Sequence, residues 1–168
     1  MPNDEITGWL TGRLPQGWYT GTPDIRADED EIWVVGTLPD VKGAEGGPEA
    51  LTAARQGRIK QHREETREQR MKIAEEAKER FRRHVAWGAR CGDQTEVFTH
   101  LSVPVMTRLR LPERELLDTL VRAGVARSRS HALAWCVRLV SKNESKWVDE
   151  LKEAIAKVGN VRSQGPLN

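Results

Sequence analysis

The segment from Val105 to Leu111, VMTRLRL, alternates between two kinds of side chain and ends at a proline. In an extended strand, successive side chains point to opposite faces. One face would carry Val105, Thr107, Leu109 and Leu111, and the other Met106, Arg108 and Arg110. Pro112 cannot extend a hydrogen-bonded ladder, but it suits the first turn of a helix. The pattern therefore predicts a short strand with an apolar face and a basic face, followed at once by a helix.

Two short helices are predicted after this strand. In ERELLDTLVRAG, residues 113–124, leucine and valine recur at helical spacing, and Gly124 is a typical C-terminal stop. In SRSHALAWCVRLV, residues 128–140, Ser128 is a good N-cap for a helix with a broad apolar surface. One strand and two short helices cannot close a core by themselves. Pairing with a second copy would supply an antiparallel two-stranded ribbon over a shared helical core.

The residues RLRLP and AGVARSRSHALAWCVRLV, with the apolar helix between them, resemble the ribbon-helix-helix DNA-binding family of the MetJ and Arc type. The resemblance covers about residues 103–141 and implies a homodimer on double-stranded DNA. Its ribbon would enter the major groove, where Met106, Arg108 and Arg110 would read base edges. The start of the second helix would hold a phosphate, through Arg127, Ser128, Arg129 and Ser130. His131 departs from the family, which often has an acidic residue there.

The physical chemistry of these residues is compatible with that role. A major groove about 12 Å wide admits a two-stranded ribbon, and arginine can pair bidentately with guanine. The free N–H groups at a helix start form an anion site. A simpler alternative is that Arg108 and Arg110 only keep an edge strand soluble.

Charge is distributed unevenly along the chain, although the net charge is only +2. Residues 1–54 carry three Lys/Arg against ten Asp/Glu, whereas residues 55–90 carry twelve against six and residues 103–168 twelve against seven. Such asymmetry favours a polyanionic partner for the basic segments. The acidic N-terminal part could be a solvated flank, an internal screen or a surface that binds a protein.

An α+β fold in four parts is predicted. Residues 1–48 would form an acidic module with a turn-rich start, a β-hairpin over residues 24–38 and a linker. Residues 49–102 would form one long charged helix over residues 50–83, solvent-exposed in its middle, and a second hairpin. Residues 103–160 would form the ribbon-helix-helix unit with an extra helix over residues 146–158, and residues 161–168 a frayed tail.

No motif nominates an enzyme, a cofactor or a metal site. The four histidines are scattered, and the two cysteines, Cys91 and Cys136, lie far apart and are expected to be reduced and buried. No apolar run is long enough to span a membrane, and the first residues do not read as an export signal. The chain is therefore expected to be cytoplasmic and nucleoid-associated.

The resemblance and the charge distribution predict a dimeric, sequence-specific DNA-binding protein, most simply a transcriptional regulator. One alternative is a protein-interaction component, antitoxin-like or a scaffold, in which the C-terminal unit serves only for dimerisation. The aromatic cluster Trp9, Trp18, Tyr19 and Trp33 motivates this alternative, although aromatic residues in a small module more commonly form its own core. A nucleoid-coating protein with little sequence preference is the third possibility.

Overall fold

The computed structural model describes residues 2–41 and 47–163, and within these ranges the chain forms six helices and four strands, an α+β fold. It divides into two compact units, residues 1–104 and residues 105–168, called unit 1 and unit 2 below. The charge follows this division: unit 1 contains 15 Lys/Arg and 18 Asp/Glu, and unit 2 contains 12 and 7. Residues 42–46 of the predicted linker and residues 164–168 of the predicted tail lie outside the described residues.

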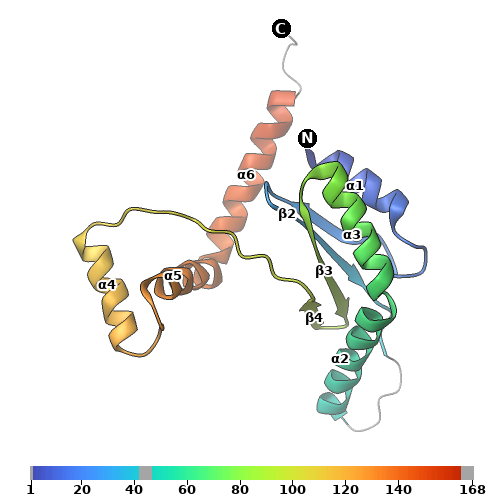
Figure 1. Ribbon diagram of the computed structural model, residues 1–168, viewed down its shortest axis with the longest axis horizontal. Coiled ribbons are helices and arrows are strands. Elements are labelled where there is room, and N and C mark those ends of the chain that lie inside the picture. The colour runs from blue at the N-terminus through green and yellow to red at the C-terminus, as the bar shows by residue number, and fades with distance from the viewer. Residues whose placement is uncertain (1, 42–46, 164–168) are drawn as a thin grey trace. The chain divides into compact units, whose positions relative to one another are not determined.

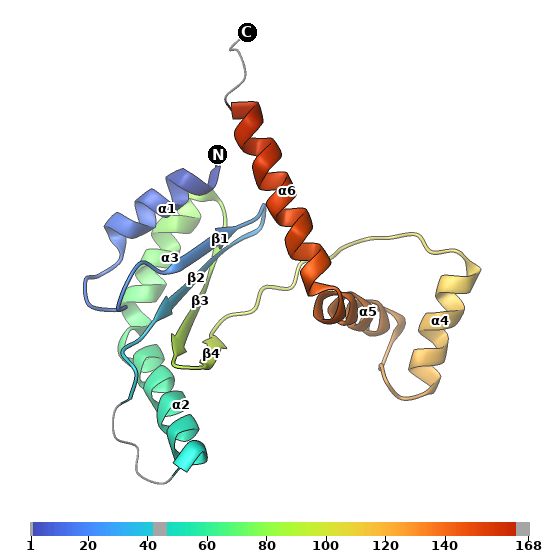
Figure 2. The same cartoon turned by 180° about the vertical axis from the view of Figure 1, so that it is seen from behind.

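Unit 1 is built on one four-stranded sheet with helices on one of its faces (Figures 1 and 2). Its elements, in chain order, are α1 (Pro2–Arg13), β1 (Asp24–Ala27), β2 (Glu31–Thr37), α2 (Gly47–Glu65), α3 (Arg67–Phe81), β3 (His84–Cys91) and β4 (Gln94–Val97). The strand order is β1-β2-β3-β4. β2 and β3 pair in parallel, while the outer pairs are antiparallel.

Both predicted hairpins are present, and the central parallel pair joins them into a single sheet. Glu31 pairs with His84 and Thr37 with Arg90 along the full length of β2. A parallel connection needs a long crossover, and α2 and α3 supply it. The segments 1–48 and 49–102, predicted as separate parts, therefore share one sheet and one core.

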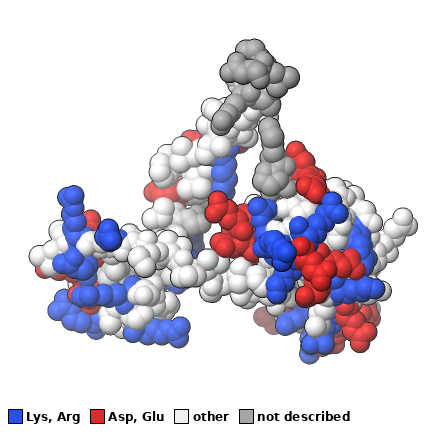
Figure 3. All heavy atoms as spheres, turned by 45° about the horizontal axis from the view of Figure 1, so that its top comes forward, with Lys and Arg blue, Asp and Glu red and all other residues white. Residues whose placement is uncertain are grey.

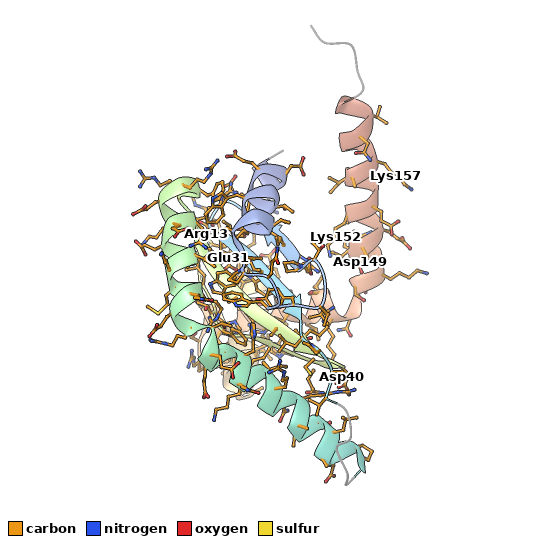
Figure 4. The ribbon with its side chains drawn as sticks, turned by 90° about the vertical axis from the view of Figure 1, so that its right-hand side faces the viewer. Arg13, Glu31, Asp40, Asp149, Lys152 and Lys157 are labelled. Atoms are coloured by element: carbon orange, nitrogen blue, oxygen red, sulfur yellow. The ribbon has the colours of Figure 1, made fainter. Side chains whose placement is uncertain are left out.

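The N-terminal segment is helical, and the prediction of a turn-rich start was wrong for residues 2–13. α1 places Ile6 and Leu10 one turn apart, and both are buried against Ile32 and Val34 of β2. Arg13, labelled in Figure 4, forms a bidentate ion pair with Glu76 of α3, at 2.6 and 2.8 Å. Packing on the sheet thus outweighs the poor helix propensity of two glycines in this segment.

The long predicted helix is broken at Thr66, and its polar middle is buried along one side. His62, Thr66 and Arg70 are all buried, between the apolar anchors Ile59 and Ile73. The Arg70 guanidinium donates to Thr66 Oγ1 at 3.0 Å and to the Arg63 carbonyl at 2.6 Å. The expectation of a fully exposed charged rod was wrong, because hydrogen bonds between the polar residues themselves make their burial tolerable.

The aromatic residues of unit 1 belong mainly to its own core. Trp9 and Trp18 pack against the buried cluster, whereas Trp33 lies on the opposite face of the sheet and is partly exposed. Cys91 is buried, Cys136 of unit 2 is partly buried, and both are free thiols. None of the described helices is long and apolar enough to cross a membrane.

Replacing Gly36 with alanine should destabilise unit 1, because a Cβ there would collide with the Tyr19 ring that lies over it. We expect a loss of about 1–3 kcal/mol in the free energy of unfolding, as for other overpacked sites, measured by urea denaturation. Gly8→Ala is the matched control: its Cβ would meet open space within α1, and it should be neutral or stabilising. Equal effects of the two substitutions would contradict the packing of Tyr19.

The stability of unit 1 should fall in mild acid because of His62. Burial first, and then the positive charges of Arg70 and Arg58, lower the pKa of His62 from 6.5 to about 4, while Glu65 partly opposes this shift. The unfolded chain therefore binds the proton more readily than the folded one. The contribution of neutral His62 to the free energy of unfolding is complete above about pH 6.5 and is lost as the pH falls toward 4. Denaturation profiles of wild type and His62→Gln should diverge in this window, and parallel profiles would refute the assignment.

Unit 2 contains three helices and a very small core. α4 spans Leu111–Arg122, α5 Arg129–Asn143 and α6 Ser145–Ser163, which confirms the three predicted helices and extends the last of them. Among the described residues of unit 2, the buried hydrophobic ones are Leu117, Ala126 and Ala132. Residues 98–110, all of them described, form no regular strand in the single chain, and α4 already begins at Leu111. The strand predicted over residues 105–111 is therefore absent from the single chain, because an isolated segment has no neighbouring strand to pair with.

Candidate nucleic-acid interface

A tight turn holds α4 against α5. Gly124 adopts the left-handed conformation, with φ of +74°, as expected of a glycine that ends a helix. The carbonyl of Leu120 then accepts hydrogen bonds from the N–H groups of Val125 and Ala126, at 3.0 and 3.2 Å. Leu117, Ala126 and Ala132 meet inside this corner. The predicted stop at Gly124 is confirmed, and it sets where α5 begins.

The first turn of α5 is organised by Ser128 and His131. Ser128 is the N-cap, and its hydroxyl accepts from the His131 N–H at 3.2 Å, as predicted. His131 in turn accepts at Nδ1 from the Arg127 N–H at 3.3 Å. The histidine therefore closes the cap toward the preceding loop. The N–H groups of Arg129 and Ser130 lie in the first helical turn, where no intrahelical acceptor is available to them.

The side chain of Arg129 is already engaged within unit 2. Its guanidinium donates to both carboxylate oxygens of Asp118 on α4, each at 2.6 Å. This pair lowers the pKa of Asp118 and raises the pKa of Arg129. The ion pair joins α4 to α5. It occupies the guanidinium of Arg129 and leaves the backbone N–H, the group predicted to bind a phosphate, outside the pair.

The predicted reading residues are exposed. Met106 is 94% exposed, and Arg108 and Arg110 also lie on the surface. No carboxylate among the described residues lies within ion-pair distance of either guanidinium, whereas the Arg110 N–H donates to Glu113 Oε2 at 2.5 Å. The backbone is thus held where the segment enters α4, while both arginine side chains are left uncompensated.

The apolar face of the same segment is largely uncovered. Leu109 packs against the small core of unit 2, and its carbonyl accepts from Arg114 Nη1 at 2.7 Å. Val105, on the same parity, is 87% exposed, and Leu111 is also exposed. Further large apolar side chains are exposed on α4, on α5 and in the turn between them: Leu116, Val125, Val137, Leu139 and Val140. Large exposed apolar side chains in this number favour an interaction surface.

Basic residues are neutralised less in unit 2 than in unit 1. In unit 1, arginines pair with carboxylates on neighbouring elements, as in Arg55 with Asp40 and Asp93, Arg63 with Glu96, and Arg80 with Glu5. In the described part of unit 2, the ion pairs are Arg129–Asp118 and Lys152–Asp149. On the face in Figure 3, blue and red atoms are interspersed over unit 1, while blue and white predominate over α4 and α5.

Part of the positive charge of the basic segment 55–90, for which a polyanionic partner was predicted, is engaged within unit 1. Arg55 and Arg63 are held by carboxylates, and Arg70 is buried. Neither the Arg129–Asp118 pair nor the buried row His62, Thr66 and Arg70 has a signal in the sequence that would have revealed it. Both depend on how helices pack in the folded chain, and the polar residues involved do not stand out from other polar residues in the sequence.

Two family descriptions match separate parts of the chain. Residues 4–97 match the N-terminal domain of the Rv1265-like protein, and residues 110–162 match the Mb1296 C-terminal domain. These spans agree with the two structural units, and residues 98–109 fall between them.

Mycobacterial relatives cover nearly all of the chain. Protein Mb1296 of Mycobacterium bovis and protein Rv1265 of Mycobacterium tuberculosis, both described as uncharacterized, are each 50% identical to it over 159 residues. The alignments include 94% of this chain and 69% of each relative. No solved structure matches the chain significantly.

Proposed function

The chain belongs to the Rv1265-like family, and from this premise we propose that unit 2 makes it a dimeric, sequence-specific DNA-binding protein, most simply a transcriptional regulator. One observation carries the proposal: residues 105–111 present an uncovered apolar face together with two exposed arginines that no carboxylate neutralises. An uncovered apolar face is unfavourable in water, and one association would cover it while presenting the arginines on the opposite face.

The association is a side-by-side, antiparallel pairing of the segment that precedes α4, residues 104–110, from two copies. Backbone groups that have no ladder partner in one chain would then pair across the two-fold axis. Val105 and Leu109 would turn toward the joined helices, with Leu111 in the first turn of α4, and Met106, Arg108 and Arg110 would face outward. The dimer would also cover exposed leucines and valines of α4 and α5, which supports the proposal because Leu117, Ala126 and Ala132 alone make a very small core.

The outward face of such a ribbon suits the major groove of double-stranded DNA. Two copies would present four guanidinium groups, and each can donate two hydrogen bonds to one guanine. The N–H groups of Arg129 and Ser130, at the start of α5, would take a phosphate on each side, with Arg127 and Ser128 beside them. Two-fold symmetry requires an operator in the form of an inverted repeat.

Selection of bound sequences from random duplex DNA tests the proposal with the full-length chain. Enrichment of a short inverted repeat is the expected result. Uniform, strongly salt-dependent binding without enrichment would indicate a nucleoid-coating protein. If the chain is dimeric but binds no DNA, unit 2 serves only for dimerisation. Capture of a specific protein by unit 1 would then support the protein-interaction alternative.

A further inference from the structure

The last helix of unit 2, α6, is exposed along nearly all of its length. Every residue from Asp149 to Val161 is exposed, within a helix that spans Ser145–Ser163. Most of the stability of a helix in a protein comes from packing of its apolar face. The described part of the chain does not cover that face of α6, which leaves the helix without the packing that would hold it.

Apolar side chains recur along α6 at the spacing of a coiled-coil seam, which has two apolar positions, a and d, in every seven residues. Leu151 and Val158 lie at a positions, and Trp147, Ala154 and Val161 lie at d positions. The four large side chains of this seam are between 44% and 72% exposed. A seam of large apolar side chains that the described chain leaves uncovered indicates a second helix as its partner.

The charges of α6 suit another helix better than a membrane surface. Residues 145–161 carry three lysines and three acids, whereas a helix that lies on an anionic membrane is rich in lysine and arginine on its polar face. Glu150 and Lys157 flank the seam on the same side, at g positions one heptad apart. Neither has an ion-pair partner among the described residues (Lys157 is labelled in Figure 4). The edge of the seam therefore carries opposite charges that α6 itself does not neutralise.

We infer that α6 pairs in antiparallel orientation with α6 of a second copy of the chain. In such a pair, each a position faces a d position of the partner, and the g positions face each other. Leu151 then lies opposite Ala154 of the partner subunit. Trp147 lies opposite Val158 of the partner subunit. A large side chain thus faces a smaller one in each of these layers, which allows the two helices to approach closely.

The charges favour this arrangement over its alternatives. Glu150 meets Lys157 of the partner subunit, and the two-fold axis repeats this ion pair. A shift by one heptad in either direction would place Glu150 or Lys157 opposite its own copy, which like-charge repulsion disfavours. Parallel helices would place Glu150 opposite Ile155 of the partner subunit and would leave the carboxylate without a cation. The antiparallel register without a shift is the one that pairs both charges.

Pairing through α6 requires neither the ribbon of residues 104–110 nor DNA. The seam spans about two heptads, which is short for a coiled coil. Association through α6 should therefore be weaker than association through the ribbon and its helices, and it should be lost first on dilution.

Two charge reversals test the pairing, by sedimentation of the full-length chain over a range of concentrations. Glu150→Lys and Lys157→Glu each set like charges against each other twice. Each variant alone should therefore self-associate through α6 about tenfold more weakly than wild type. In an equimolar mixture, one variant carries only positive charges at these two positions and the other only negative charges. The mixture should associate as wild type does, through mixed pairs.

Glu153→Lys is the matched control, because it makes the same charge change on the side of α6 that faces away from the seam. It should leave self-association unchanged. The recovery in the mixture should persist when Leu116→Lys, on α4, is added to both variants, so that a failure of the ribbon and a failure of α6 pairing give different results. A mixture that associates no better than either variant alone, or an equal effect of Glu153→Lys, overturns the antiparallel pairing.

Discussion

Alanine at both Arg108 and Arg110 is expected to abolish the preference for the selected operator while leaving a weak, salt-sensitive affinity for any duplex. Each bidentate contact to guanine contributes about 1–3 kcal/mol of discrimination, and the dimer carries each arginine twice. Both side chains are exposed and free of carboxylates, so their removal should not unfold unit 2. Competition binding with the operator and with scrambled duplexes measures the loss.

Single substitutions distinguish residues that read bases from residues that bind phosphates. Replacing a base-reading residue should relax the preference at particular base pairs. Replacing a phosphate-binding residue should weaken the affinity for all sequences alike and reduce the salt dependence by about one ion per residue. Lys142→Ala, an exposed cation in the last turn of α5, is the control. Uniform weakening in both arginine variants would leave unit 2 a non-specific binder.

Lysine at Leu116 is expected to separate the dimer. Leu116 lies on the apolar side of α4 and is 56% exposed in the single chain, although such a side chain gains about 1.5–3 kcal/mol when buried. The two-fold interface of the variant would lose two leucines and would have to bury two unpaired charges. The affinity of one copy for the other should therefore fall by at least about a hundredfold. Sedimentation over a range of concentrations measures the change.

The control for this substitution is Met71→Lys in α3 of unit 1, since Met71 is exposed to nearly the same degree. It should leave the dimer and the affinity for DNA unchanged. If Leu116→Lys also leaves the dimer intact, the apolar side of α4 does not lie in the dimer interface. A monomeric variant that keeps full operator selectivity would contradict the proposed reading by two copies.

Local signals in the sequence were sufficient for much of unit 2 and for both hairpins. Gly124 ends α4 because a left-handed residue is needed there, and Ser128 begins α5 because its hydroxyl can accept a backbone N–H. Each signal acts within a few residues of its position. Alternation at residues 105–111 predicted a strand that the single chain does not form, and the reading role of Met106, Arg108 and Arg110 stays a prediction.

Tertiary packing decided the rest. α1 forms because Ile6 and Leu10 find the sheet, and β2 pairs with β3 across more than forty residues that contain α2 and α3. The buried row at His62 and Arg70, and the pair of Arg129 with Asp118, join polar groups whose neighbours exist only in the folded chain. Sequence patterns report on a residue's own helix or strand. Burial of a polar group depends on partners that the fold brings to it, and no local pattern contains them.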